Sequence, residues 1–178
     1  MMNACEEEKR LHRCCFTGHR PEKLGVSENK IKQLLSLAID DAIKDGYVIF
    51  IVGMARGVDL WAGEIVLQRK QSNTNVKLIC ATPYSGFEAG WKQYWRKLYT
   101  SIASHADYRV AIGSKYSLRC FQKQNEWMVN HSSLVIAVYN GYPGGTRNTI
   151  CYAEKHKVHV KNVLNANRYS WMKEKAGI

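Results

Sequence analysis

Residues 47–59 read YVIFIVGMARGVD, and this stretch decides the fold class. Its first six residues, 47–52, are continuously apolar and partly β-branched, a pattern typical of a strand that is covered on both faces. Gly53 ends this strand, and residues 58–69 have the spacing of a helix. A buried strand that leads directly into a helix indicates parallel pairing, because parallel strands need a crossover connection.

The same alternation of apolar runs and amphipathic stretches continues along the chain. Further strands are expected at residues 13–17, 76–81, 108–112, 133–139 and 158–164. Further helices are expected at residues 27–45, with Ser27 as the N-cap, and at residues 91–102, 118–130 and 144–156. Strands separated by helices cannot form hairpins. The sequence therefore predicts an α/β fold: a single doubly wound, Rossmann-like parallel sheet with helices on both faces.

The chain has 178 residues, of which 46% are hydrophobic, and this is enough for one hydrophobic core. We assign residues 13–165 to the domain, residues 1–12 to an N-terminal tail and residues 166–178 to a C-terminal tail or short helix. No apolar run approaches the length of a membrane-spanning helix, and the first residues are charged where a secretory signal is apolar. We therefore expect a soluble, cytoplasmic protein that does not enter a membrane.

The chain has six cysteines, and none of them forms a CxxC pair or a Cys/His spacing typical of a metal site. Cys14, Cys15 and Cys80 lie in apolar segments with the pattern of strands, where a free cysteine packs as a small hydrophobic side chain. We interpret the cysteines as reduced thiols and expect no metal site.

The net charge of +11 comes from 26 basic and 15 acidic residues, and the excess is uneven. Up to Gly46 there are 8 bases and 8 acids, so the rest of the chain holds 18 bases against 7 acids. Such a bias is typical of a surface that meets phosphates or nucleic acid. A basic surface with no dedicated partner explains the charge equally well.

Three of the loops that follow expected strands contain both glycine and arginine. They are residues 17–21 (TGHRP), 53–59 (GMARGVD) and 143–149 (PGGTRNT). In doubly wound sheets ligands bind beyond the carboxyl ends of the strands, and a glycine turn at a helix N-terminus with a nearby guanidinium favours an oxyanion. These loops predict a phosphorylated ligand. The absence of a GxGxxG fingerprint and of a Walker A motif argues against NAD-dependent oxidoreduction and P-loop hydrolysis.

Several stretches resemble one known family. They are residues 16–25 (FTGHRPEKLG), 53–62 (GMARGVDLWA) and 134–139 (LVIAVY), followed by Gly144-Gly145-Thr146. The chain resembles, over about residues 13–160, the DUF1273 or YpsA-like family of the SLOG superfamily, which also groups the DprA/Smf DNA-processing proteins and the LOG proteins. The resemblance implies a Rossmann-like fold with a nucleotide or nucleotide-derived ligand at the strand ends. It specifies no reaction.

The three loops would divide the ligand between them. We expect the first loop to hold one part, the second the ribose or base, and the third a phosphate. The expected ligand-binding residues are Thr17, Gly18, His19, Arg20, Gly53, Arg56, Gly57, Asp59, Gly144, Gly145, Thr146 and Thr149. Two of them have ordinary alternatives, because Asp59 could simply cap a helix and a lone loop histidine such as His19 is more often exposed.

An enzymatic reading comes from the LOG branch, whose members hydrolyse the N-glycosidic bond of a nucleoside monophosphate with a PGGxGTxxE loop. Here the second glycine is lost, Ile150 or Cys151 stands where the glutamates are expected, and the nearest carboxylate is Glu154. An oxocarbenium-like transition state needs a close carboxylate. We therefore favour a nucleotide-binding or sensing module over an N-glycosidase, for which Glu154 and Asp59 are the catalytic candidates.

A second alternative is binding of single-stranded nucleic acid, as in DprA. The sequence shows no compact basic stripe interleaved with aromatics, so we expect only weak, non-specific binding, and a homo-oligomer is compatible with the sequence. We interpret the apolar helical face that begins at Trp91 as core packing, and Glu64 as a solvated helix residue. The resembled family tends to have arginine where Gln124 stands, so a ligand contact there would need Lys123 or another group.

Overall fold

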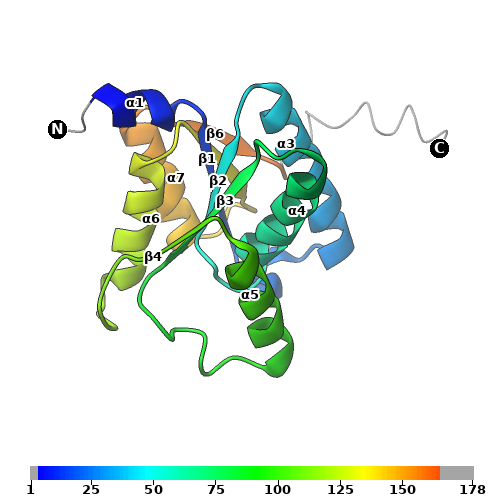
Figure 1. Cartoon of the computed structure of the whole chain (residues 1–178). Coiled ribbons are helices and arrows are strands. Elements are labelled where there is room, and N and C mark those ends of the chain that lie inside the picture. The colour runs from blue at the N-terminus through cyan, green and yellow to red at the C-terminus, as the bar shows by residue number, and fades with distance from the viewer. Residues whose placement is uncertain (1–3, 165–178) are drawn as a thin grey trace.

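Six parallel strands form one sheet in the computed structural model, which describes residues 4–164 (Figure 1). The strands are β1 (Arg13–Gly18), β2 (Ile49–Val52), β3 (Lys77–Thr82), β4 (Tyr108–Ala111), β5 (Leu134–Val138) and β6 (His159–Asn162). The helices are α1 (Ala4–Arg10), α2 (Pro21–Leu24), α3 (Glu28–Lys44), α4 (Val58–Ser72), α5 (Gln93–His105), α6 (Cys120–Asn130) and α7 (Gly145–Lys155). The strand order is β4-β3-β2-β1-β5-β6, so the order reverses between β1 and β5.

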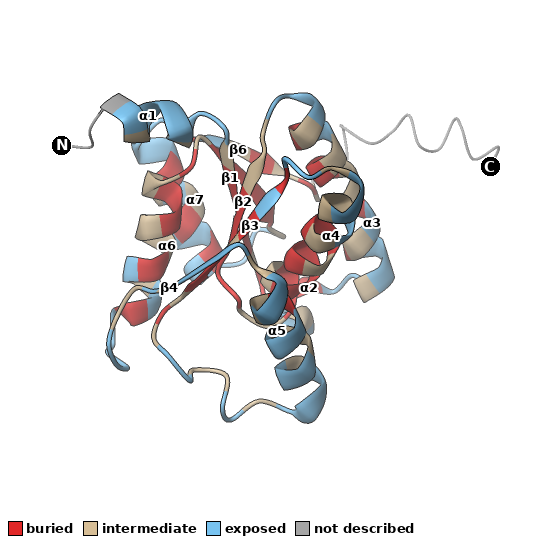
Figure 2. Ribbon diagram, viewed as in Figure 1, coloured by how far each residue is buried: buried red, intermediate tan, exposed pale blue. Residues whose placement is uncertain are grey.

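Helices cover both faces of the sheet, which confirms the doubly wound prediction. Because successive side chains of a strand point to opposite faces, Cys14 and Phe16 pack with α3, α4 and α5, whereas Cys15 packs with α6 and α7. Figure 2 shows the buried residues gathered in the central strands and on the helix sides that face them. The sheet is thus the middle layer of three, with a core on each side.

The start of β2 is set by the end of the helix before it. Ser27 caps α3 by accepting a hydrogen bond from the Lys30 amide (3.4 Å), as expected. At the other end Gly46 has φ 91°, its amide donates to Ile43 O (3.1 Å), and the Tyr47 amide donates to Ala42 O (3.0 Å). This is a Schellman motif. It uses the Tyr47 amide, so the strand predicted from residue 47 begins at Ile49.

Two short helices were not expected. The segment that the sequence analysis assigns to an N-terminal tail contains α1, which is tied to the domain by the Glu6–Arg13 ion pair (3.0 Å) and by the hydrogen bond from Arg10 Nε to Ser132 O (2.9 Å). The first glycine–arginine loop contains α2, which begins at a proline as helices often do. The expected tail at 166–178 lies outside the described residues.

Most of the apolar face around α5 packs against the core, as predicted, but Tyr94 is exposed. Trp91 precedes the helix instead of starting it, and its ring meets those of Phe87 and Tyr99 with centroids 5.1 and 6.0 Å apart. Trp95 packs against the buried Trp61 (6.0 Å). Across residues 4–164, the helices all lack the length and apolar character needed to cross a bilayer.

Close packing of the end of β1 against the start of α4 gives the first prediction. A Cβ added at Gly18 would lie 2.7 Å from Val58 Cβ, a distance that real contacts do not reach. We expect Gly18→Ala to lower the free energy of unfolding by about 2 kcal/mol, because the strand or Val58 must move. Urea denaturation measures the change.

Gly90→Ala is the matched control, since nothing lies within 4 Å of a Cβ at that position. It should change the free energy of unfolding by less than about 0.5 kcal/mol. Equal stabilities of the two variants would contradict the close packing. Val58→Ala in the Gly18→Ala background removes the two Val58 methyl groups that also crowd the new Cβ but keeps Val58 Cβ, so it should recover only part of the loss.

Candidate functional site

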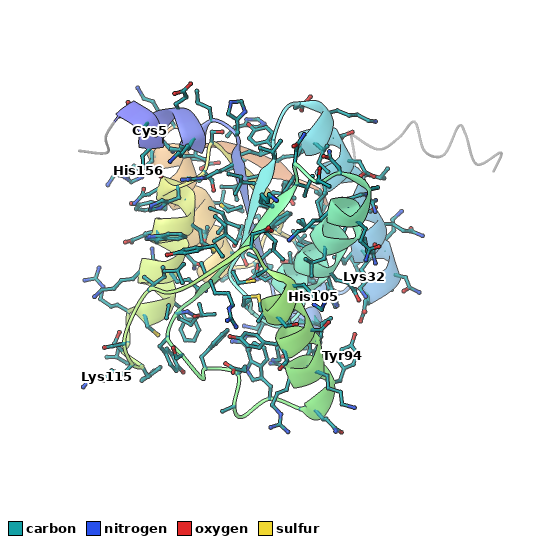
Figure 3. All side chains as sticks on the ribbon, in the orientation of Figure 1. Cys5, Lys32, Tyr94, His105, Lys115 and His156 are labelled. Carbon is teal, nitrogen blue, oxygen red and sulfur yellow. The ribbon has the colours of Figure 1, made fainter. Side chains whose placement is uncertain are left out.

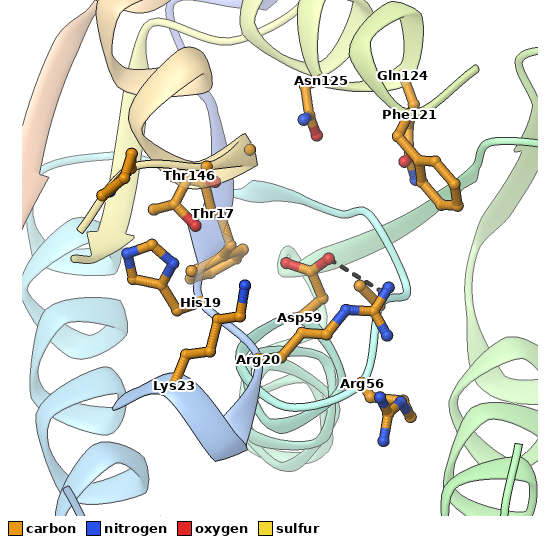
Figure 4. Close-up of a pocket in the computed structure, with 16 residues that line it drawn as sticks. Thr17, His19, Arg20, Lys23, Arg56, Asp59, Phe121, Gln124, Asn125 and Thr146 are labelled. Carbon is orange, nitrogen blue, oxygen red and sulfur yellow. Dashed lines mark hydrogen bonds between the residues drawn. The ribbon is translucent and has the colours of Figure 1, made fainter. Parts of the chain in front are cut away.

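A cavity of about 270 Å³ lies at the carboxyl end of β1, beside the reversal of strand order. Its walls come from the end of β1 with α2, the loop between β2 and α4, the first half of α6, and the loop before α7 (Figure 4). The lining residues are Phe16, Thr17, Gly18, His19, Arg20, Lys23, Ala55, Arg56, Asp59, Phe121, Gln124, Asn125, Pro143, Gly144, Gly145 and Thr146. This is where doubly wound sheets bind ligands.

The structure brings most of the sequence-predicted residues together on this cavity. Three of them, Gly53, Gly57 and Thr149, are not among the lining residues and instead support the walls. Thr149 Oγ1 donates to Gly145 O (2.9 Å), and Gly57 has φ 92° at the N-cap of α4. A Cβ at Gly53 would lie 2.8 Å from the Asp59 carboxylate. All three therefore support the walls of the cavity without being among its lining residues.

His19 is buried, with 5% of its surface exposed, so the expectation of an ordinary exposed loop histidine is wrong. Its ring packs against that of Tyr139 (5.5 Å), and its Nε2 has no hydrogen-bond partner among residues 4–164. Burial, together with the nearby charge of Lys23, lowers the pKa of His19. An imidazole whose Nε2 has no partner among the described residues therefore lies at the cavity, beside Thr17 and Thr146 (Figure 4).

Three basic side chains line the cavity, and two of them form no ion pair with the described residues. Arg56 is the paired one, since its Nη2 contacts Glu22 Oε1 at 3.1 Å. Arg20 and Lys23 form no ion pair within residues 4–164, and Figure 4 shows the Lys23 ammonium extending toward the cavity. The charge of the site therefore favours an anion.

Asp59 is the one carboxylate among the lining residues. It lies in the first turn of α4 but does not cap it, because Gly57 is the N-cap and the Asp59 carboxylate instead accepts the Ala55 amide (3.1 Å). Burial raises the pKa of Asp59 to about 7, although the Ala55 hydrogen bond and the charge of Arg20 act in the opposite direction. Near neutral pH this carboxyl is thus present in both forms and can donate or accept a hydrogen bond.

The N-terminus of α7 supplies an anion site on the opposite wall. The helix begins at Gly145 after Gly144, no side chain caps it, and its first turn contains no acidic residue. A Cβ at either glycine would meet nothing within 4 Å, so the space before the helix is open. Free amide groups and the helix dipole at such an end favour a phosphate.

Gln124 has a structural role in place of the family's expected arginine. Its buried amide donates to Gly53 O (2.6 Å) and Ala81 O (2.7 Å), which holds α6 against the ends of β2 and β3. Lys123, considered as a substitute, is exposed and absent from the lining residues. Lys23, Phe121 and Asn125 line the cavity but were not among the expected ligand-binding residues. Lys23 lies within the family-like stretch at 16–25, and Asn125 lies in a helical segment that also resembles the family, whereas Phe121 gave no signal.

The carboxylate expected after the glycine loop does not reach the cavity. Glu154 is exposed on α7 and is not among the lining residues. Glu64 is not simply solvated, because it pairs with Lys32 at 3.0 Å. Within residues 4–164 no three His, Cys, Asp or Glu side chains are grouped so as to hold a metal ion.

The structure is that of a Rossmann-like α/β protein. Its cavity is cationic, is lined by glycines and lies where the strand order reverses. The model of the YpsA family, described as the YspA SLOG family, matches residues 14–167, and the chain belongs to that family. UPF0398 proteins of Bacillus thuringiensis strain Al Hakam and Bacillus cereus strain AH187 are each 32% identical over 154 residues, covering 82% of this chain and 84% of theirs.

Solved structures of DNA processing protein A share the fold. The Streptococcus pneumoniae protein matches with a TM-score of 0.59 and 14% identity over 94% of this chain, which spans 56% of that protein. The Helicobacter pylori protein, whose structure concerns single-stranded DNA binding, matches with a TM-score of 0.61 and 16% identity, covering 98% of this chain and 76% of that one. The likeness confirms the Rossmann-like fold predicted from the sequence.

Burial of Asp59 gives a prediction about stability and pH. Its pKa is about 7 in the folded protein against an ordinary value of 3.8, so ionisation above pH 4 favours the unfolded chain. Asp59 therefore does not change the free energy of unfolding below about pH 4. As the pH rises from about 4 to about 7, it lowers this free energy progressively. We expect the stability of Asp59→Asn relative to the wild type to rise progressively between these pH values, by about 4 kcal/mol over the whole window.

Urea unfolding of both proteins at several pH values measures this difference. Glu22 and Asp107, whose pKa values are lowered, titrate in both proteins and cancel in the comparison. Curves of stability against pH that stay parallel would show that Asp59 ionises normally.

Proposed function

We propose that this protein binds a nucleotide or nucleotide derivative in the cavity at the end of β1 and acts as a binding or sensing module. The observation that carries the proposal is the convergence on one cavity of polar groups that have no partner among residues 4–164. They are the open N-terminus of α7, the Nε2 of buried His19, and the side chains of Arg20 and Lys23, which form no ion pair with these residues. Together these groups form a site in which an oxyanion can accept several hydrogen bonds.

The positions of these groups suggest how the ligand is divided. A phosphate would accept hydrogen bonds from the α7 amides after Gly144 and from the hydroxyl of Thr146, with the Lys23 ammonium as counter-charge. Asp59 would bond ribose hydroxyls, which both donate and accept as its carboxyl does near neutral pH. Membership of the SLOG family supports the same assignment.

Hydrolysis of the N-glycosidic bond is the alternative that one observation favours. A lining carboxyl with a pKa of about 7 suits a general acid or base. However, glycoside hydrolysis commonly uses two carboxylates. Among the described residues, Asp59 is the only carboxylate that lines the cavity. The binding module is therefore the better-supported reading.

Binding of nucleic acid is the remaining alternative. It draws on the net charge of +11 and on the shared fold with DprA. Attraction of phosphates by a basic protein is strong at low salt and weakens steeply as salt rises. We therefore propose weak, non-specific binding of nucleic acid beside the specific binding of a small ligand.

The phosphate position is tested with Gly145→Asp. We expect its affinity for nucleoside monophosphates to fall at least about tenfold, because the new carboxylate occupies the open space before α7 and repels an anion. Calorimetric titration with AMP and UMP measures the affinity, and mass spectrometry of small molecules released from the denatured wild type identifies any natural ligand. Gly90→Asp introduces the same charge into another open position and should bind as the wild type does. Unchanged affinity in a folded Gly145→Asp variant would remove the α7 loop from the site.

If the protein is a binding module, it should release no free base from purine or pyrimidine nucleoside monophosphates above background. The reason is that the second carboxylate required for efficient glycoside hydrolysis does not reach the cavity. Chromatography of the incubated nucleotides detects the base directly. Base release that is lost in Asp59→Asn but kept in Glu154→Gln would establish the hydrolase instead.

A further inference from the structure

We propose that Phe121, supported by Tyr84 and Tyr116, is a stacking surface for the nucleobase of the ligand and holds it without selecting its identity. This inference rests on the proposed function and adds the part of the ligand that lies away from the phosphate. It concerns an aromatic cluster that none of the three glycine-containing loops includes. The cluster borders the cavity through Phe121 alone.

Phe121 is an aromatic residue that lines the cavity and does not belong to the hydrophobic core. It lies in the first turn of α6 and keeps 39% of its surface exposed. The ring of Tyr84 meets it in an edge contact, with centroids 6.5 Å apart and planes at 68°. Tyr84 in turn makes an edge contact with Tyr116, at 6.0 Å and 83°. Phe121 is therefore supported by its neighbours while part of its surface remains open.

Three of the eight exposed large apolar side chains among the described residues lie in one short stretch of the chain. Tyr116, Leu118 and Phe121 are exposed by 60%, 93% and 39% within six residues. Grouped exposed apolar surface commonly marks a binding site, because it costs free energy in water unless a ligand covers it. Since Phe121 also lines a cavity suited to an anion, a planar base attached to a phosphate is the ligand chemistry that fits both.

The cavity has the layout that such a ligand requires. Figure 4 shows His19 and Thr146 on one side, Phe121 on the other, and Asp59 with Arg20 between them. A phosphate at the start of α7 would leave the ribose over Asp59 and direct the base toward Phe121. The aromatic ring would thus meet the base face, where every nucleobase offers a π surface.

Little on this side of the cavity could read the edge of a base. Gln124 and Asn125 are the polar side chains that α6 contributes to the lining, and Gln124 is engaged with the carbonyls of Gly53 and Ala81. That leaves the Asn125 amide and the Gln124 Oε1 acceptor as the polar groups of α6 available to a base. Recognition by stacking therefore favours aromatic bases as a class.

The experiment compares ligands with and without a base. AMP, UMP and ribose 5-phosphate are titrated calorimetrically into the wild type, Phe121→Ala and Phe121→Trp. We expect Phe121→Ala to lose roughly 5- to 100-fold in affinity for AMP and UMP, the range that a stacking contact gives, with ribose 5-phosphate unchanged. Phe121→Trp should keep or improve binding of both nucleotides, which tests the inference even if the alanine variant does not fold.

Tyr94→Ala is the matched control. Tyr94 is 54% exposed and makes an edge contact with Trp95 (4.9 Å), but it lies on α5, away from the cavity lining (Figure 3). Its removal should leave all three affinities unchanged. The comparison separates loss of a stacking surface from loss of any exposed aromatic.

The outcomes separate this inference from the function on which it rests. If AMP and ribose 5-phosphate bind alike and Phe121→Ala alters neither, the stacking surface is wrong while the phosphate site stands. If none of the three probes binds the wild type, both are wrong. If only a single-stranded oligonucleotide binds, at physiological salt and through Phe121, the partner is nucleic acid and the proposed small ligand is wrong.

Discussion

The central position of β1 constrains everything else in this structure. β1 pairs in parallel with β2 on one side and with β5 on the other, and Cys14, Cys15 and Phe16 are completely buried. Parallel neighbours can be reached only through crossover helices of one hand. The chain therefore adds β2, β3 and β4 in one direction, then returns to add β5 and β6 in the other. The loops that leave β1 and β5 diverge at that point, and the cavity lies between them.

Much of the fold could be predicted because it depends on local patterns. Apolar runs gave the six strands, and Ser27 and Gly46 marked the ends of α3 in chain order. The loops that line the site followed from the topology, since the ends of parallel strands share one edge. The helix α1 was missed because its seven-residue sequence is strongly charged and is held by distant groups, among them the Ser132 carbonyl.

The site was less predictable, because its chemistry depends on burial and on residues distant in sequence. Nothing local indicates that His19 is buried or that burial raises the pKa of Asp59 to about 7. The role of Gln124 could not be inferred either, because its partners, Gly53 and Ala81, are 71 and 43 residues away. Phe121 was missed for the same reason. It precedes β5, whereas the signals that the sequence offered were glycines that follow strands.

The desolvation of Asp59 and the anionic ligand are compatible for an electrostatic reason. A fully ionised carboxylate in the cavity would oppose a phosphate and would reduce the effect of Arg20 and Lys23. Because burial raises the pKa of Asp59, its carboxyl is protonated in a large fraction of molecules at neutral pH, and that fraction does not repel an anion. Burial also lowers the pKa of His19, and the basic side chains of Arg20 and Lys23 are exposed. Burial thus reduces the negative charge of Asp59, the one carboxylate among the lining residues. The exposed basic side chains leave the cavity cationic.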